Sequence, residues 1–286
     1  MGIDHAAPLI PDRRQRARHV SVGLALLLTL ICILSLAIGA SGTSLWSALG
    51  KLVSGQSLTQ MEQVVLWDIR APRLALGLLV GAALAVSGAV MQGLFRNPLA
   101  DPGLVGVSAG AGLGAVTAIV LGGMLPPGVI DAIGHWLVPV AAFFGGWAST
   151  LVLYRVATRR GRTSVAALLL AGIAHGALAG AVSGILVYMA DDQQLRDLTF
   201  WGLGSLAGAT WAKVVVAGPM IALALFASLL LGRGLNGLAL GEATAHHLGI
   251  DVQRLKNGAI LTVAGGPRRA KDREGSKWEK RRVLTR

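Results

Sequence analysis

Long apolar segments separated by short polar ones dominate the pattern of this chain. Six of these segments have roughly the 20 apolar residues that an α-helix needs to cross a bilayer. A seventh begins near Leu255 and gives way to basic sequence soon after residue 260. The pattern therefore predicts an all-α fold, a polytopic transmembrane helical bundle of six spans plus a fragment of a seventh. The six expected spans are residues 20–40, 74–94, 103–123, 136–156, 163–189 and 211–231.

The composition supports an integral membrane protein. Hydrophobic residues make up 53% and charged residues 14% of the 286 positions, and the mean hydropathy is +0.63. Soluble domains carry about 25% charged residues. The single cysteine, Cys32, falls inside the first apolar segment. A disulfide within the chain is therefore impossible, and we expect Cys32 to behave as a small buried hydrophobic residue.

The net charge of +12 raises the question of nucleic-acid binding, but its distribution argues against that class. Residues 265–286 contain nine Lys and Arg and three acidic residues, so half of the net charge lies in this tail. Much of the remaining charge lies in short loops, where basic residues set the orientation of a membrane protein. We therefore expect a lipid bilayer and no nucleic acid as a partner.

Basic residues predict that the N-terminus lies in the cytoplasm. Residues 1–19 carry four arginines directly before the first apolar segment, which is too long for a typical signal peptide. With this end inside, twelve Lys and Arg fall in segments assigned to the inside and five in segments assigned to the outside. The positive-inside rule predicts this asymmetry. Arg70 and Arg73 are exceptions, because they lie on the outer side.

The predicted spans carry no Asp, Glu, Lys or Arg near their middles. An ion-coupled secondary transporter usually needs such groups in the membrane, so the pattern disfavours this class but leaves it as one alternative. The sequence also lacks the G-x-x-x-x-G-K-[ST] phosphate-binding loop. If the chain moves a substrate uphill, we expect ATP and Mg²⁺ to bind a partner subunit. The chain itself is then no enzyme and binds no cofactor.

Glycines recur every four residues in two of the predicted spans. Residues four apart share a helix face, and small residues there let two helix backbones approach closely. Helix packing is the preferred interpretation, and the wall of a path that opens and closes is the second. The sequence leaves both open. The positions are Gly106, Gly110 and Gly114 in one span, and Gly172, Gly176, Gly180 and Gly184 in another.

Residues 106–110 match the G-x-S-x-G pattern of serine hydrolases, with Ser108 as the nucleophile. An intramembrane serine hydrolase with His175 as the base is therefore a second alternative. That pattern requires a preceding β-strand, whereas here a proline-bounded loop precedes it. The adjacent His246 and His247 would not face the same way on a helix, so we predict no metal site.

Two motifs close together in the chain resemble a known family. The sequence IRAPR at residues 69–73 precedes GAALAVSGAVMQGLFRNPLADPGLVGVSAGAG at residues 81–112. This stretch resembles the permease subunits of FecCD-type (BtuC-like) ABC importers, which carry iron-siderophores, haem or cobalamin across the bacterial inner membrane. The resemblance extends from about Val20 to Lys256. The sequence DDQQLRDLTFWGLGSLAGATW at residues 191–211 is most similar to haem importers, so haem is the first expected substrate.

The resemblance implies a type II ABC importer permease fold and a homodimer in the inner membrane. Two ATPase subunits in the cytoplasm and a periplasmic substrate-binding protein would complete the importer. Arg70 and Arg73 would receive acidic residues of the binding protein, since the planar guanidinium pairs with a carboxylate through two hydrogen bonds. The ATPase subunits would contact a coupling segment that contains Gly241, Glu242, Ala243, His246, His247, Leu248 and Gly249.

The resemblance ends before the C-terminus. Members of the family continue with further spans, whereas residues 261–286 are basic and have no counterpart among them. We therefore expect a basic cytoplasmic N-terminus over residues 1–19, a permease domain over residues 20–260, and a basic non-family tail over residues 261–286. On this interpretation the permease fold is incomplete at its C-terminus, through truncation or a frameshift.

Overall fold

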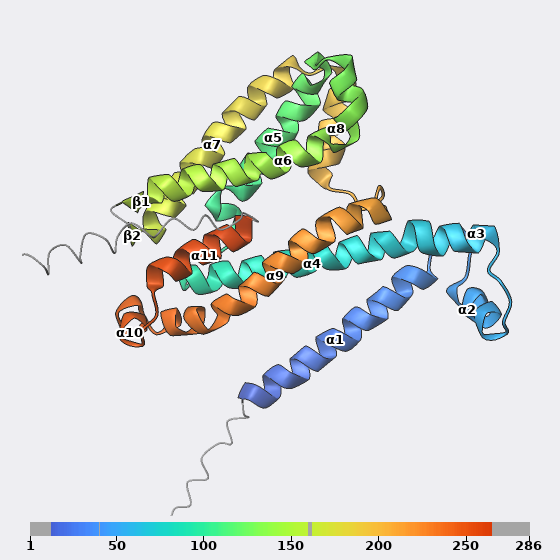
Figure 1. The fold of residues 1–286 in the computed structure, drawn as a ribbon, viewed down its shortest axis with the longest axis horizontal. Helices are drawn as coiled ribbons and strands as arrows, with labels where there is room; N and C mark the ends of the chain where they lie inside the picture. The colour runs from blue at the N-terminus through green and yellow to red at the C-terminus, as the bar shows by residue number, and fades with distance from the viewer. Residues whose placement is uncertain (1–12, 40, 160–161, 265–286) are drawn as a thin grey trace, which may run out of the picture. The chain divides into compact units, whose positions relative to one another are not determined.

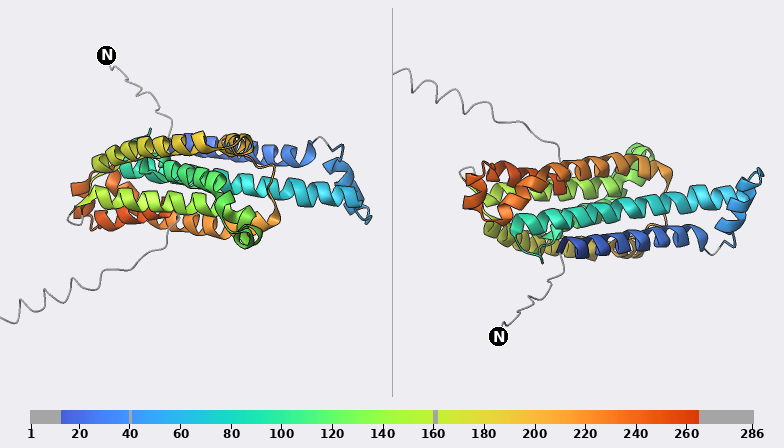
Figure 2. Two further views of the ribbon diagram at one scale, coloured as in Figure 1. Left: turned by 90° about the horizontal axis from the view of Figure 1, so that it is seen from above. Right: turned by 90° about the horizontal axis from the view of Figure 1, so that it is seen from below.

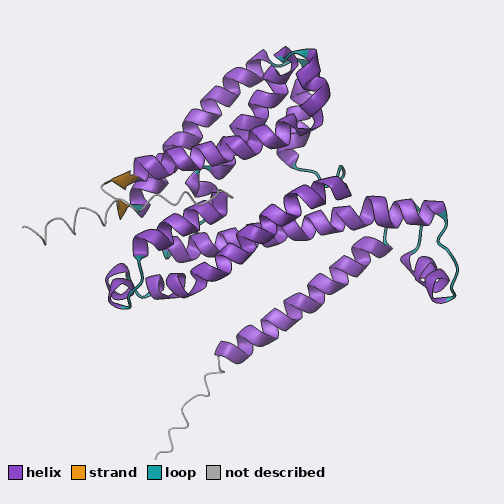
Figure 3. Cartoon of the chain, in the orientation of Figure 1, coloured by secondary structure: helices purple, strands orange, loops and turns teal. Residues whose placement is uncertain are grey.

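The computed structural model describes residues 13–39, 41–159 and 162–264, and most of these residues belong to helices (Figures 1 and 3). The predicted all-α fold is confirmed, and the tail from residue 265 onward lies outside the described residues. The α-helices are α1 (Arg13–Ala37), α2 (Leu45–Val53), α3 (Gln60–Gln63), α4 (Ala71–Phe95), α5 (Val107–Leu121), α6 (Pro127–Ala157), α7 (Val165–Met189), α8 (Asp192–Leu203), α9 (Trp211–Ala239), α10 (Glu242–His247) and α11 (Val252–Ala264).

Six helices in the described part of the chain are long and apolar enough to cross a membrane, which confirms the six predicted spans. The helices often extend beyond the predicted limits. Hydropathy marks the stretch that fits the bilayer, whereas a helix continues until its end is capped. The candidate spans are Arg14–Ala37, Gln60–Phe95, Val107–Met124, Trp136–Ala157, Val165–Met189 and Trp211–Ala239.

The second span belongs to a longer helix than the sequence predicted. α3, a π-helical segment (Val64–Arg70) and α4 follow one another without a break, whereas the predicted span began at residue 74. Pro72 lacks an N–H group, and the wider π-helical turn before it accommodates the missing hydrogen bond. The helix Gln60–Phe95 has 36 residues and is about 54 Å long, which exceeds the roughly 30 Å hydrocarbon core. Its polar first turns therefore lie outside the bilayer.

The chain divides into two compact units. The first unit holds the described residues of 1–78 and 206–216, and the second those of 79–205 and 217–286. In the first unit, α1 is one uninterrupted helix (Figure 2) whose apolar side chains are largely exposed, such as Leu26 at 67%. Lipid tails are as apolar as leucine, so such a surface suits direct contact with the bilayer.

In the second unit, α5, α6 and α7 lie side by side (Figure 1). A buried core joins α4, α6, α7, α9 and α11. Since lipid offers the same apolar surroundings as the core, close van der Waals packing holds these helices together more than the exclusion of water does. The most buried large side chains of this core are Met91, Leu153, Leu168, Leu238 and Ile260.

α5 and α6 meet through their backbones. A Cβ atom at Gly110 would overlap with the carbonyl oxygen of Gly145, and one at Gly114 would overlap with the carbonyl oxygen of Ala141. At the start of α5, Gly106 has a φ of 78° and is buried against Leu153. The first glycine row therefore lies along the contact with α6, where a side chain of any size would separate the helices.

The two-residue strands β1 (Thr158–Arg159) and β2 (Arg162–Thr163) lie between α6 and α7 and pair antiparallel. The hydroxyl groups of Thr158 and Thr163 lie 2.9 Å apart and form a hydrogen bond across the pair. Ser164 follows as the N-cap of α7, and its side chain accepts the N–H of Ala167. The first turn of α7 is therefore fixed directly to β2.

α10 is a short helix between two glycines whose φ angles are positive, 110° at Gly241 and 76° at Gly249. L-amino acids with side chains rarely adopt such angles, so glycine is required for the chain to enter and leave the helix. α11 follows and covers the seventh apolar segment. It has 13 described residues, about 20 Å at 1.5 Å per residue, which is less than a bilayer span.

Candidate partner-binding sites

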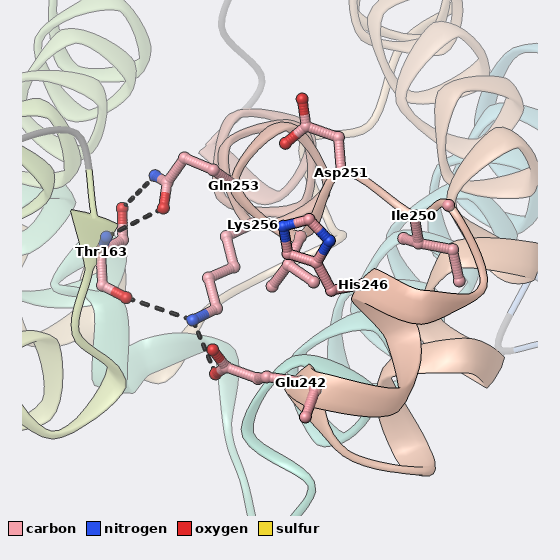
Figure 4. Close-up of a pocket in the computed structure, with 10 residues that line it drawn as sticks. Thr163, Glu242, His246, Ile250, Asp251, Gln253 and Lys256 are labelled. Carbon is pink, nitrogen blue, oxygen red and sulfur yellow. Dashed lines mark hydrogen bonds and ion pairs between the residues drawn. The ribbon is translucent and has the colours of Figure 1, made fainter.

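A pocket of about 840 Å³ lies beside α10 in the second unit (Figure 4). Its walls come from α10, from the loop that follows, from the first turns of α11 and from Thr163 of β2. Glu242, Asp251 and Lys256 place charges of both signs around it. The pocket therefore offers polar groups to a protein that contacts this end of the chain.

Lys256 connects two of these walls. Its ammonium group donates to Glu242 Oε1 at 2.8 Å and to the main-chain oxygen of Thr163 at 3.2 Å (Figure 4). The Lys256 side chain is 7% exposed, whereas that of Glu242 is 51% exposed. A buried ammonium group needs acceptors that replace its water, and here a carboxylate and a carbonyl group provide them.

Gln253 binds the same threonine from the preceding turn of α11. Its side-chain oxygen accepts the Thr163 N–H at 3.0 Å, and its amide nitrogen donates to the Thr163 hydroxyl group at 2.6 Å (Figure 4). The same nitrogen donates to Asn257 Oδ1 at 2.8 Å, and Tyr154 of α6 donates its hydroxyl to that oxygen at 2.7 Å. α11 is thus bonded to both α6 and β2.

The predicted coupling residues lie in and around α10. Ala245 is fully buried and anchors the helix, while Glu242, Ala243, His246, His247 and Leu248 are exposed. Gly241 and Gly249 are the two glycines that flank the helix. The segment thus presents a mixed polar and apolar surface, and its role in coupling stays a prediction. No group of metal-binding side chains occurs among the described residues.

Sequence reasoning missed Gln253, Lys256 and Asn257. They follow the spacing i, i+3 and i+4 within a largely apolar segment, which places them on one helix face. A polar stripe at this spacing in an apolar helix could have predicted that these side chains bind polar partners elsewhere in the fold. The partner residue Thr163 was out of reach, because it lies 90 positions away from Gln253 in the chain.

In the first unit, the predicted docking residue Arg70 is buried, with 7% of its surface exposed. Its guanidinium donates to the carbonyl oxygens of Leu36 and Thr43 and to the hydroxyl of Ser41. It also lies directly against Gly39, where any side chain would overlap with it. In this structure Arg70 fixes the end of α1, and its docking role stays a prediction.

Arg73, the other predicted docking residue, is exposed. Its guanidinium donates to the main-chain oxygen of Ala207 at 3.2 Å. Trp67 and Trp211 pack in a tilted arrangement with ring centroids 5.1 Å apart, and the Trp211 indole N–H donates to the Trp67 carbonyl oxygen at 2.8 Å. Arg73 therefore keeps a charged group available on a segment that tryptophan packing holds in place.

A salt bridge joins α2 to the start of the long helix. Lys51 Nζ lies 2.8 Å from Glu62 Oε1, and Glu62 is also part of a capping box with Thr59. The hydrogen bond from Lys51, followed by that from the Thr59 N–H, lowers the pKa of Glu62 from 4.5 to about 2. The carboxylate is therefore ionised over the physiological range and holds α2 in place.

The structure gives no support to a serine hydrolase. His175 Nε2 is 2.8 Å from Ser149 Oγ, so its hydrogen bond goes to α6 and not to Ser108. The G-x-S-x-G stretch follows a 3-10 turn (Pro102–Val105) and begins α5, so it lacks the preceding strand. His175 and Ser149 instead link α7 to α6 within the membrane-spanning region.

The second glycine row differs from the first. Gly172 is buried in α7, but a Cβ atom at Gly176, Gly180 or Gly184 would meet no described atom within 4 Å. These three glycines therefore form an open strip along α7. Whether the strip packs against a second copy of the chain or lines a path stays a prediction.

Known proteins are similar to this chain in sequence and in fold. The FecCD transport family matches residues 27–265. The hemin transport system permease HmuU of Yersinia pestis is 42% identical over 235 residues, which are 82% of this chain and 69% of that protein. The cobalamin import system permease BtuC of Halobacterium salinarum is 45% identical over 205 residues, 72% of this chain and 53% of that protein. The vitamin B12 import system permease BtuC of Klebsiella pneumoniae is 39% identical over 256 residues, 89% and 70% of the two chains.

The fold also matches a solved structure, described as a metal-chelate type ABC transporter in an inward-facing conformation. The TM-score is 0.71 at 28% sequence identity, and the match covers 87% of this chain and 73% of the other. The family match spans most of the chain, and the fold is similar to that of the solved transporter over 87% of the chain. The chain therefore belongs to the FecCD transport family and has the fold of an ABC importer permease.

Proposed function

We propose that this chain is the transmembrane permease subunit of an ABC importer that carries haem across the bacterial inner membrane. The observation that carries the proposal is the 42% identity with a hemin permease, which extends over 82% of this chain. Cobalamin is the competing substrate, because two of the relatives, at 45% and 39% identity, are cobalamin and vitamin B12 permeases. Iron-siderophores form a third class, and all three substrates are large ring or chelate molecules.

We expect an apolar cavity in the second unit to form one part of the substrate's path. It has a volume of about 350 Å³ and lies between α4, α9 and α11, with Val107 and Phe143 contributed by α5 and α6. Its lining is mostly apolar, for example Met220 and Ile221. An apolar wall offers few directional contacts, so it favours movement of a substrate over tight binding.

The energy for import comes from two ATPase subunits, which bind ATP and Mg²⁺ and contact α10 and its flanking glycines from the cytoplasm. The permease performs no covalent chemistry. Two copies of it form a homodimer around the path, with their N-termini in the cytoplasm. The ATPase subunits shift the population between inward- and outward-open packings, because they bind the two states with different affinity.

A periplasmic substrate-binding protein delivers the substrate to the outer face at Arg73 and Arg70. The exposed guanidinium of Arg73 offers a carboxylate two parallel hydrogen bonds. Arg70 stabilises the neighbouring segment, because it bonds the end of α1 and Ser41. The support for this assignment is the position of two arginines on the side of the membrane where basic residues are scarce.

The direct test is uptake into proteoliposomes that contain this permease with its ATPase and binding-protein partners. We expect ATP-dependent accumulation of haem, and no accumulation when the ATPase carries an inactivating substitution in its phosphate-binding loop. Uptake of cobalamin without haem would overturn the haem assignment and keep the importer.

Two further arms test the other function classes. Uptake that persists without ATP and stops when ionophores remove the ion gradient would show an ion-coupled carrier. Loss of all activity in Ser108→Ala would show a hydrolase, whereas we expect this permease variant to transport normally.

A further inference from the structure

We propose that Lys256 fastens the short helix α10 to β2, which pairs with β1 at the end of α6 and leads into α7, so that a displacement of α10 is passed to these two spans. The inference deepens the proposed function and rests on it, because it takes α10 as the helix that an ATPase subunit moves. Lys256 is a positioning residue in this proposal. It contacts neither the substrate nor ATP.

The first part of the argument is the bond between Lys256 and α10. The ammonium group of Lys256 lies 2.8 Å from the Glu242 carboxylate, and its side chain is 7% exposed. Among the described residues, this is the ion pair that joins α10 to another element. Because one partner is buried, water and salt weaken the pair less than they weaken a surface ion pair.

The second part is the bond from Lys256 to Thr163 of β2. The same ammonium group donates to the Thr163 carbonyl oxygen at 3.2 Å, while Gln253 takes the N–H and the hydroxyl of that threonine. Each polar group of Thr163 is thus bonded to α11. The next residue, Ser164, caps α7, so the position of Thr163 determines where α7 begins.

The third part concerns the main chain, which is the other connection between α10 and its neighbours. α10 has six residues and ends in glycines with positive φ at both sides, Gly241 and Gly249. Glycine has no side chain that restricts its backbone, so we expect these two turns alone to transmit a displacement of α10 poorly. The side-chain bridge from Glu242 through Lys256 to Thr163 provides a stiff connection instead.

A purely stabilising role makes a different prediction from a positioning role. If Lys256 only stabilised the fold, its loss would lower the amount of assembled complex and leave each complex equally efficient. If it positions α10, its loss lowers the amount of substrate moved per ATP hydrolysed, even in complexes that assemble fully.

The experiment compares Lys256→Met and Lys256→Arg with Arg254→Met in the reconstituted importer. Arg254 lies on the same helix and is 81% exposed, and its partner Asp251 is three residues earlier, so its loss leaves the bridge intact. We expect Lys256→Met to lower haem moved per ATP hydrolysed by about fivefold or more, the lower end of typical coupling between sites. Lys256→Arg restores most of this ratio, and Arg254→Met keeps it. An unchanged ratio in fully assembled Lys256→Met complexes overturns the proposal.

A second measurement needs neither transport nor the ATPase. In this chain with Cys32→Ser, spin labels at Ala166 and Ala243, two exposed positions, report the distance between the first turn of α7 and α10. We expect one narrow distance distribution, which broadens in Lys256→Met and stays narrow in Arg254→Met. The same narrow distribution in Lys256→Met overturns the bridge. A wild-type importer that moves no substrate overturns the proposed function instead, so the two failures are distinguishable.

Discussion

The guanidinium of Arg70 donates a hydrogen bond to the main-chain oxygen of Leu36, which lies 34 positions earlier at the end of α1. A carbonyl group near a helix C-terminus has no partner within the helix, so a buried arginine is well suited to satisfy it. Arg73, three residues later, remains exposed. The two arginines of one motif thus have different surroundings, and their substitutions are expected to have different effects.

We expect Arg70→Ala to destabilise the permease by about 2 kcal/mol, because it removes hydrogen bonds from a charged, buried donor. The measurement is the free energy of unfolding in detergent, followed by helix content. Arg73→Ala is the matched control and is expected to unfold like the wild type. Equal stability of the two variants would show that the contacts of Arg70 contribute nothing.

Arg73→Glu is expected to weaken association with the binding protein about tenfold at low salt, which corresponds to about 1.4 kcal/mol. The loss should shrink as salt rises, because the screening length at 0.1 M salt is about 10 Å. The measurement is a binding titration at two ionic strengths, with Lys213→Glu as a control on the same side. An unchanged affinity of Arg73→Glu at low salt contradicts the docking assignment.

The pKa of Glu62 predicts how α2 responds to acid. Its value in the folded chain is lowered to about 2, so the Lys51–Glu62 pair stabilises the fold above about pH 4.5 and loses this effect as the pH falls toward 2. A spin label at Ser57, in the exposed loop after α2, should become more mobile over this range in a Cys32→Ser background. Glu62→Gln removes the titration, so the label in that variant should keep one mobility at every pH.

Two alanine substitutions separate the glycine rows. Gly114→Ala places a methyl group on the Ala141 carbonyl, and we expect a loss of about 1–3 kcal/mol of stability. Gly180→Ala meets no described atom within 4 Å, so its effect is expected to stay within about 0.5 kcal/mol. Both are measured by unfolding in detergent. Equal losses at both positions would mean that the close contact between α5 and α6 is not what requires glycine.

α2 is expected to lie in the outer interface of the bilayer. Trp46, Leu49 and Val53 share one exposed face at 67%, 42% and 88%, while Lys51 bonds Glu62. Such a helix, a few residues from the end of a span, favours the boundary between lipid and water. Spin labels at Trp46 or Leu49 should collide more often with oxygen, which dissolves in lipid, than with a polar nickel complex. A label at Ser47 should collide more often with the nickel complex. Equal access at both faces contradicts this placement.

Much of the fold was predictable because hydropathy depends on local sequence. The six spans were predicted from apolar length alone, and α10 lies in the coupling segment that the family resemblance implied. The continuous helix through Pro72 was not predicted, because a proline usually interrupts a helix and the π-helical turn before it leaves no mark in composition.

The side-chain partners were much less predictable. A sequence shows that Arg70 and Lys256 are basic, but their carbonyl partners lie 34 and 93 positions away. Main-chain oxygen atoms are present at every residue, so nothing in the sequence marks the ones that will accept such a bond. Only the fold brings them together.

The contact between α5 and α6 has a mechanical consequence. Gly110 and Gly145 bring the two backbones into direct contact, so this part of the crossing has little room to rearrange. We therefore expect the two helices to move together as one rigid body in any conformational change. Helices can slide past one another only at surfaces that are not closely packed, and the glycine strip of α7 is such a surface.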